Sequence, residues 1–285
     1  MSFHGKRALV TGGSSGIGLA LAHQLAAKGA AVTILARNVS KLENAAIEIS
    51  QGRHEGAPEC QWLSVDVTNM QSVREALQAW LAANGAPHYL FNSAGVAHPG
   101  YAEELDLEIF HWMMDVNYYG LVHVTQTLLP AMIEGAEGHI VNISSMAGVL
   151  GVYGYTAYGA SKFAVRGSSD ALRAEMKPKG LKVSIVYPPD VETPQLAYEN
   201  QFKPPETKAL AADENPMSAD RAAEVILKGV ARGRYLIIPG LGNWLYYWLS
   251  GALGPLLYPV MDVFVRQARA SAKREVNRGG VGRKG

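Results

Sequence analysis

The chain alternates short, continuously apolar runs with longer segments in which apolar residues recur every three or four positions. The short runs are rich in β-branched and aromatic residues and are typical of strands buried on both faces. They cover residues 7–12, 31–37, 60–67, 87–92, 138–145, 181–188 and 234–240. The amphipathic segments, which predict helices, cover 17–28, 41–51, 72–84, 109–134, 158–177 and 219–232. This alternation predicts an α/β fold of Rossmann type, a doubly wound parallel sheet with helices on both faces.

The 285 residues suit one large domain with an appendage. We expect residues 1–240 to form a single catalytic and nucleotide-binding domain. Within it, residues 188–216 contain several prolines and lack clear periodicity. Long irregular segments of compact domains are often lids, so we assign this one as a lid. Residues 241–285 form a C-terminal extension that is first apolar and then basic.

The extension carries an unusual pattern, because no charged residue occurs between Tyr235 and Met261. Glycines and prolines interrupt the part from 241 to 265, which indicates interfacial or re-entrant helices more than a clean membrane span. Basic residues follow and suit an anionic membrane surface: Arg266, Arg269, Lys273, Arg274 and Arg278. Three roles stay open for this segment: docking on a membrane surface through 241–278, capping an apolar substrate pocket, or a dimer contact.

Composition narrows the class of protein. Apolar residues make up 48% and charged residues 18% of the chain, which is typical of a globular protein. The net charge of +1 gives no reason to expect nucleic acid as a partner. Cys60 is the single cysteine, and no spacing of His and Cys predicts a metal site. With no apolar run before the first strand, we expect a cytoplasmic protein, either free or peripheral on the cytoplasmic face of a membrane.

A glycine-rich stretch, TGGSSGIG, joins the first predicted strand to the first predicted helix. Gly12, Gly16 and Gly18 allow a tight turn and a close backbone approach, and the helix N-terminus then faces a pyrophosphate. Ser14 can add a hydrogen bond within the turn. Glycines in such a turn can also be purely steric, but the strand–turn–helix context predicts a dinucleotide.

The end of the second strand discriminates between the two nicotinamide dinucleotides. An NAD site usually has an acidic residue there for the ribose 2′-hydroxyl. This chain has Ala36 and Arg37 instead, and a guanidinium can pair with a 2′-phosphate. The pattern therefore favours NADPH/NADP+ as the cofactor.

Tyr158 and Lys162 lie four residues apart in a predicted helix, and only small residues separate them. Such a pair shares one helix face, so the lysine charge would favour the phenolate and lower the tyrosine pKa. Ser145, at the end of the preceding strand, can donate a hydrogen bond to a substrate oxygen. Taken alone, the pair would be a solvated helix face. Behind a dinucleotide motif it predicts proton transfer to a ketone that accepts a hydride.

These motifs together resemble the short-chain dehydrogenase/reductase family over about residues 6–240. TGGSSGIG, NSAG at 92–95 and YGASK at 158–162 match its motifs in order, as do the stretches that contain Asn117 and Ser145. The resemblance implies a ketone reductase whose catalytic residues are Asn117, Ser145, Tyr158 and Lys162. Two departures, Ser93 and Pro189, replace an Asn and a Gly of the family pattern and concern turn support and loop stiffness.

The resemblance also implies further roles. Asn117 would hold a water near Lys162, and Lys162 would bind the nicotinamide ribose as well as tune Tyr158. The cofactor-binding positions carried over are Gly12, Ser14, Ser15, Gly16, Ile17, Gly18, Arg37, Asp66, Val67, Asn92, Ala94, Gly95, Tyr158, Lys162, Pro188, Val191 and Thr193. Family members commonly form homodimers or homotetramers, and this chain is expected to do the same.

Residues 187–207 and 154–167 are similar to the subgroup that reduces 3-ketodihydrosphingosine to dihydrosphingosine in sphingolipid synthesis. We therefore expect a long-chain lipid ketone as substrate. Two alternatives stay open: reduction of another hydrophobic ketone, such as a steroid or a 3-oxoacyl compound, and a non-catalytic NADP-binding protein at a membrane. The intact set of proton-transfer residues argues against the second.

Overall fold

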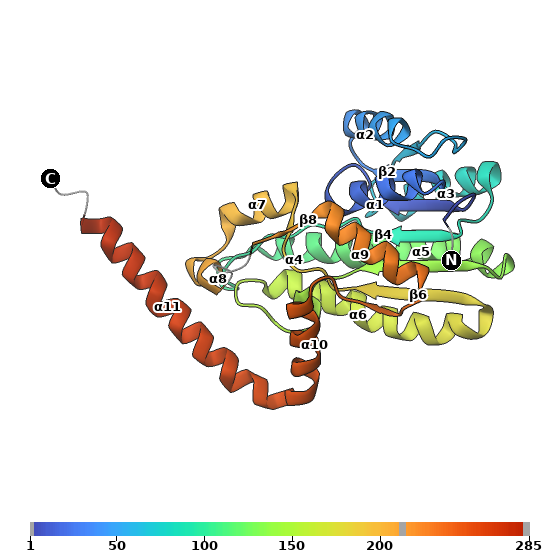
Figure 1. Ribbon diagram of the computed structural model, residues 1–285. Helices are drawn as coiled ribbons and strands as arrows, with labels where there is room; N and C mark the ends of the chain where they lie inside the picture. The colour runs from blue at the N-terminus through green and yellow to red at the C-terminus, as the bar shows by residue number, and fades with distance from the viewer. Residues whose placement is uncertain (1–2, 211–214, 282–285) are drawn as a thin grey trace.

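The computed structural model describes residues 3–210 and 215–281, with side chains described as far as residue 270. Seven parallel strands form one twisted sheet at its centre (Figure 1). They are β1 (Arg7–Thr11), β2 (Ala31–Ala36), β3 (Gln61–Ser64), β4 (Tyr89–Asn92), β5 (Gly138–Ile143), β6 (Leu181–Val186) and β9 (Leu236–Ile237). Their order is β3-β2-β1-β4-β5-β6-β9, so all seven predicted strands and the doubly wound Rossmann-type topology are confirmed.

Burial explains why the apolar runs form strands. Every residue of β4 is buried, and β1, β2 and β5 are buried along all but their first or terminal positions. The prediction of burial on both faces was wrong for β3, in which three of the four residues are exposed. This strand is the edge of the sheet and pairs only with β2. An edge strand has one neighbour and incomplete cover by helices, so its side chains reach solvent.

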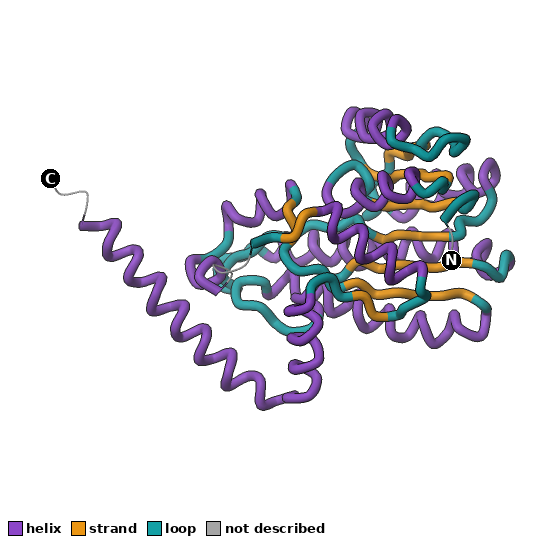
Figure 2. Tube along the Cα trace, viewed as in Figure 1, coloured by secondary structure: helices purple, strands orange, loops and turns teal. Residues whose placement is uncertain are grey.

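Helices cover both faces of the sheet (Figure 2). Helices α1 (Gly16–Ala27), α2 (Val39–Gln51) and α9 (Ala219–Ala231) contribute to one apolar core. Helices α3 (Met70–Asn84), α5 (Gly120–Glu134) and α6 (Thr156–Met176) contribute to the other. Asn38, Asn69 and Ser218 cap the first turns of α2, α3 and α9 with side-chain oxygens, which explains where these helices begin.

The helix predicted over 109–134 is interrupted. The structure has α4 (Leu107–Met114), a π-helical turn (Asp115–Tyr119) and then α5. Asn117 lies within the π turn, where its side chain bonds to both backbone groups of Val96. Wider π turns mark functional sites in many helices because they re-aim one side chain. The contact between Asn117 and Val96 joins distant segments, so the periodicity of the sequence could not predict it.

The segment predicted as an irregular lid, 188–216, contains more regular structure than its sequence pattern indicated. It forms β7 (Val191–Glu192), α7 (Pro194–Phe202) and α8 (Pro205–Leu210), with residues 211–214 outside the described part. Thr193 caps α7 by accepting a hydrogen bond from the Leu196 amide. β7 pairs with β8 (Met217–Ser218), which closes the excursion into a two-stranded sheet.

The C-terminal extension forms α10 (Leu241–Leu253), a 3₁₀ turn (Gly254–Leu256) and α11 (Leu257–Val281). Gly254 has a φ of +50° and precedes Pro255, so the chain turns there before α11 runs along the outside of the domain past α8 (Figure 1). By length and composition alone, Leu241–Ala270 could cross a membrane, and only 6% of its most apolar window is buried. The basic side chains of Lys273, Arg274 and Arg278 lie outside the described residues.

A buried histidine on β5 forms a hydrogen bond with a side chain on β6. His139 on β5 is 2% exposed, and its Nε2 lies 2.7 Å from the Ser184 hydroxyl on β6. Burial lowers the pKa of His139 from its usual 6.5 to about 4, and the charge of Lys182 adds to this. The folded protein therefore holds His139 neutral.

This burial predicts a loss of stability in acid. Because the folded-state pKa is below the unfolded value, the unfolded chain binds the extra proton, and stability falls as the pH decreases from about 6.5 toward about 4. Lowering the pH from 7.5 to 5.5 should decrease the free energy of unfolding by about 1 kcal/mol, because His139 is protonated in the unfolded chain only. Urea titrations of the wild type and His139→Gln at both pH values measure this difference. An equal pH dependence in the two proteins would contradict the assignment.

Candidate active site

The carboxyl ends of the central strands open into one cavity of about 820 Å³. In a doubly wound sheet ligands bind at this edge, where the strand order reverses between β1 and β4. The cavity brings together twelve of the residues predicted for the site: Gly12, Ser15, Gly16, Ile17, Gly18, Gly95, Ser145, Tyr158, Lys162, Pro188, Val191 and Thr193. Segments far apart in the chain thus meet in one place.

The glycine-rich turn between β1 and α1 forms one wall of this cavity. A Cβ on Gly18 would stand 2.3 Å from the Gly12 carbonyl oxygen, and one on Gly12 would stand 2.9 Å from backbone atoms of Ala94. Gly12 and Gly16 also have positive φ angles of 67° and 54°. Side chains are therefore excluded, and the free amides at the start of α1 face the cavity, which fits a dinucleotide pyrophosphate.

Tyr158 and Lys162 lie on the cavity-facing side of α6 and are both buried. The Lys162 ammonium is 5.6 Å from the Tyr158 ring centroid and donates a hydrogen bond of 3.2 Å to the Ile143 carbonyl. Ser145 lies close enough to Tyr158 to lower the pKa of the phenol, and its hydroxyl accepts a hydrogen bond of 3.2 Å from the Ala147 amide. A phenol, an ammonium and a hydroxyl thus converge at the end of β5, beside the glycine-rich turn.

The electrostatics differ from the sequence-based expectation that Lys162 lowers the tyrosine pKa. Burial raises the pKa of Tyr158 well above 10, the Glu199 charge adds to this, and hydrogen bonds to Ser145 and Gln195 only partly oppose it. Burial lowers the pKa of Lys162 to about 8, against the attraction of Glu199. At neutral pH Tyr158 is therefore a neutral phenol, the form that can donate a proton.

Asn117 does not line the cavity but supports it from behind. It is 2% exposed, and its amide nitrogen donates to the Val96 carbonyl and to the Ser161 hydroxyl, both at 2.9 Å. Its oxygen accepts from the Val96 amide at 2.8 Å. A Cβ placed on Gly95 would stand 3.3 Å from the Asn117 oxygen and 3.4 Å from the Lys162 ammonium. Asn117 and Lys162, which the family resemblance pairs through a water, therefore lie close to each other.

The other predicted cofactor residues are not among those that line the cavity. Arg37 directly follows β2; its side chain is 61% exposed, and its guanidinium lies 3.9 Å from the Asp66 carboxylate. Val67, next to Asp66, is buried. Asn92 is buried and donates to Thr125 and Asn142, so its side chain supports the sheet interior. Ser14 and Ala94 do not line the cavity either; the Ala94 amide donates to the hydroxyl of Thr11.

The motifs missed part of the cavity wall. Tyr155, Gln195, Glu199 and Lys203 line it from the start of α6, from α7 and from just beyond α7. Gln195 and Glu199 are four residues apart, a spacing that could have indicated a paired helix face. The C-terminal helices also contribute: Gly242, Asn243, Tyr246, Met261 and Phe264 line the same cavity. Residues of the extension thus line the cavity, as a pocket-capping role would require, and that role stays a prediction.

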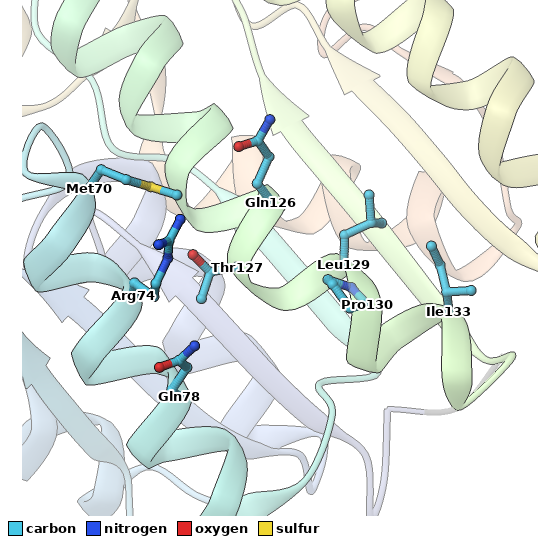
Figure 3. A pocket seen from close by; sticks show the side chains of 8 residues that line it. All are labelled: Met70, Arg74, Gln78, Gln126, Thr127, Leu129, Pro130 and Ile133. Atoms are coloured by element: carbon cyan, nitrogen blue, oxygen red, sulfur yellow. The ribbon is translucent and has the colours of Figure 1, made fainter.

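A second hollow lies between α3 and α5, and Figure 3 shows its lining. It has a volume of about 420 Å³ and contains a single charged side chain, Arg74, beside the amides of Gln78 and Gln126. None of the predicted catalytic or cofactor-binding residues lies there. The cavity at the sheet edge is thus the site that carries chemistry.

A glycine-rich turn at the switch point and a buried Tyr–Lys pair beside it define a nicotinamide-dependent oxidoreductase of Rossmann type. Residues 6–204 match the family model described as short chain dehydrogenase. The chain belongs to the short-chain dehydrogenase/reductase family.

Named relatives cover most of the chain. It is 35% identical to a 3-dehydrosphinganine reductase of Danio rerio over 260 residues, which is 90% of this chain and 77% of that protein. It is 36% identical to a 3-ketodihydrosphingosine reductase of Dictyostelium discoideum over 275 residues, 92% of this chain and 82% of that one. A crystal structure of a short-chain dehydrogenase/reductase from Burkholderia phymatum in complex with NAD matches with a TM-score of 0.79 at 28% identity, covering 90% and 96% of the two chains.

Proposed function

We propose that the protein reduces the keto group of 3-ketodihydrosphingosine to dihydrosphingosine, with NADPH as hydride donor. The observation that carries this proposal is the cavity that joins the Tyr158–Lys162 pair to a wall from the C-terminal helices, with Tyr246 of α10 and the apolar Met261 and Phe264 of α11. Such a cavity suits a substrate with a ketone at one end and a long alkyl chain at the other. Relatives named for this reaction match 90% or more of the chain, which supports the same substrate.

The chain's own residues supply the proton and the positioning. The bound dinucleotide supplies a hydride to the carbonyl carbon. Ser145 orients the carbonyl oxygen through a hydrogen bond, and Tyr158, held neutral by burial, gives that oxygen its proton. Lys162 provides a positive charge beside the phenol, which stabilises the phenolate left after transfer. Asn117 holds the backbone of Val96 and the hydroxyl of Ser161 around this lysine.

A substrate panel tests the reaction and the proton donor together. The wild type should oxidise NADPH fastest with 3-ketodihydrosphingosine, compared with a 3-oxosteroid and a 3-oxoacyl thioester. Tyr158→Phe removes only the donating hydroxyl and should lower kcat by at least about 100-fold. NADPH affinity, followed by nucleotide fluorescence, should be nearly unchanged.

Tyr187→Phe is the matched control, because Tyr187 is also buried and follows β6 but packs on Tyr247 outside the cavity. Full turnover by Tyr158→Phe would remove this residue as the donor. A wild type that prefers the steroid or the thioester would overturn the proposed substrate.

The preference for NADPH rests on Arg37, the residue directly after β2. Arg37 is exposed at the carboxyl edge of the sheet, and its pair with Asp66 is long and solvated, so it holds the guanidinium weakly. A 2′-phosphate can therefore take Asp66's place as the partner of Arg37. The two residues at and directly after the end of β2 are Ala36 and Arg37, so no acidic side chain stands there.

Exchanging Arg37 for Asp should shift the preference toward NADH. The substitution removes the phosphate partner and adds repulsion, so kcat/KM with NADPH should fall by about 10-fold to 100-fold. The value with NADH should stay equal or rise. Arg74→Asp makes the same charge change in the hollow of Figure 3 and should leave the ratio of the two values intact. Equal kcat/KM for both cofactors in the wild type would contradict the assignment.

Membrane contact through 241–278 is also part of the proposal. Leu241, Trp244, Leu245, Trp248 and Leu249 form an exposed apolar stripe, 46% to 83% exposed, on the side of α10 away from the cavity-lining Asn243 and Tyr246. Apolar area of this extent indicates an interaction surface. A bilayer surface would cover it and hold the protein where a long-chain ketone resides. The homodimer or homotetramer implied by the family resemblance stays a prediction.

Co-sedimentation with vesicles tests this surface. The wild type should pellet with vesicles of phosphatidylcholine and phosphatidylglycerol, whereas Trp248→Glu should bind at least about 10-fold more weakly, since one buried apolar side chain contributes about 1.5–3 kcal/mol. Ile47→Glu, at a 58% exposed position on α2, is the matched control and should pellet like the wild type. A wild type that stays in the supernatant, with dimers in sedimentation velocity, would assign the stripe to a second copy instead.

A further inference from the structure

A buried carboxylate lies in the cavity beside the proposed proton donor. Glu199 on α7 is only 7% exposed and lines the same cavity as Tyr158 and Lys162. Its Oε2 accepts a hydrogen bond of 2.7 Å from the Tyr155 hydroxyl, and its Oε1 accepts one of 2.8 Å from the Gln195 amide. These two bonds fix the orientation of the carboxylate, and both donors are themselves cavity-lining residues.

The two partners of this carboxylate are neutral. Within the part of the chain that the structure describes, no lysine, arginine or histidine nitrogen lies within 4.0 Å of Glu199. The nearby Lys203 ammonium instead pairs with Asp190 at 3.1 Å. Burial raises the pKa of Glu199, and the bonds from Gln195 and Tyr155 and the charge of Lys203 lower it only in part. A buried carboxylate without a cation costs several kcal/mol, so this one is poised to accept one.

The carboxylate is also within electrostatic reach of the chemistry. Its charge raises the pKa of both Tyr158 and Lys162. The Tyr155 ring, whose hydroxyl it accepts, lies 5.6 Å from the Tyr158 ring. Groups on the carbon next to the reacting ketone therefore enter the field of Glu199.

The proposed substrate carries an amino group on that adjacent carbon, and at neutral pH the amine is an ammonium. We propose that Glu199 binds this ammonium and so selects 2-amino ketones over neutral long-chain ketones. This inference rests on the proposed function and adds to it the residue that recognises the headgroup. The ammonium supplies the cation that the buried carboxylate lacks, and pairing the two places the ketone carbon next to Tyr158.

Other carboxylates near the cavity lack this combination. Asp190 also lines the cavity, but its side chain is 46% exposed and pairs with Lys203. Glu206 on α8 resembles Glu199 in accepting a tyrosine hydroxyl, that of Tyr101, at 2.7 Å. It does not line the cavity, and Arg269 lies 3.8 Å from it. Glu206 is therefore a matched control for Glu199.

The test compares two ketones that differ only in the amino group: 3-ketodihydrosphingosine and its desamino analogue, 1-hydroxyoctadecan-3-one. Glu199→Gln keeps the shape and an acceptor for Tyr155 but removes the charge. We expect kcat/KM for the amino ketone to fall by about 10-fold to 100-fold, the effect of a lost charge-assisted hydrogen bond. The value for the desamino ketone should change by a clearly smaller factor, the part that Glu199 contributes through the pKa values of Tyr158 and Lys162, and intact NADPH binding shows that the variant is folded. Glu206→Gln should keep the wild-type ratio.

The outcomes distinguish a failure of ammonium recognition by Glu199 from a failure of the proposed reaction. Equal losses on both ketones in Glu199→Gln, with NADPH binding intact, would show that Glu199 acts through Tyr158 or Lys162 and would overturn ammonium recognition. A wild type that reduces other ketones but not the amino ketone would instead overturn the proposed function.

A second measurement on the wild type does not depend on the folding of any variant. Dodecylamine should inhibit the reduction of the desamino ketone at a concentration about 10-fold or more below that of 1-dodecanol, because only the amine pairs with Glu199. Equal inhibition by the two compounds would overturn the inference.

Discussion

The buried side-chain amide of Asn117 is the contact on which the geometry of the site depends. It bonds to both backbone groups of Val96, beyond β4, and to the hydroxyl of Ser161 on α6. Ser161 in turn donates to the Tyr158 carbonyl, one turn back on the same helix. Leaving any of these buried groups unpaired would cost about 1–3 kcal/mol, so the register of α6 against the sheet is well determined. That register presents Tyr158 and Lys162 to the cavity together.

Periodicity and motifs were sufficient for the sheet, because continuously apolar runs are required wherever helices cover both faces. All seven strands lie within their expected bounds, although β3 and β9 are much shorter than predicted, and five of the six predicted helices form close to theirs. The π turn at Asn117 was not predictable in this way, since the contacts of Asn117 with Val96 and Ser161 join distant segments. Helix α7 was missed although Thr193 and Pro194 are local signals for a helix start. The roles assigned to the individual site residues stay predictions; what the structure adds is that twelve of them share one cavity.

Burial explains why the sequence misjudged the electrostatics of the Tyr–Lys pair. Spacing along a helix shows that two side chains are neighbours but not how much water surrounds them. Here both groups are buried, so desolvation raises the pKa of Tyr158 and lowers that of Lys162 to about 8. The charge of Glu199, a residue that no motif marked, raises the pKa of Tyr158 further and offsets part of the decrease in the pKa of Lys162. A neutral phenol suits a proton donor for ketone reduction, so the shift is consistent with the proposed direction of the reaction.

The cavity wall contains both polar and apolar side chains, and this constrains how the proposed substrate is oriented. Charged and hydrogen-bonding groups gather around Tyr158 and Glu199, whereas Met261 and Phe264 of α11 supply an apolar part of the wall. A long-chain amino ketone can satisfy both ends in one orientation only, with its headgroup at Glu199 and its alkyl chain toward α10 and α11. The exposed stripe lies on the opposite side of α10 from the cavity-lining Asn243 and Tyr246. In that orientation the alkyl chain points toward the same two helices that carry the proposed membrane contact.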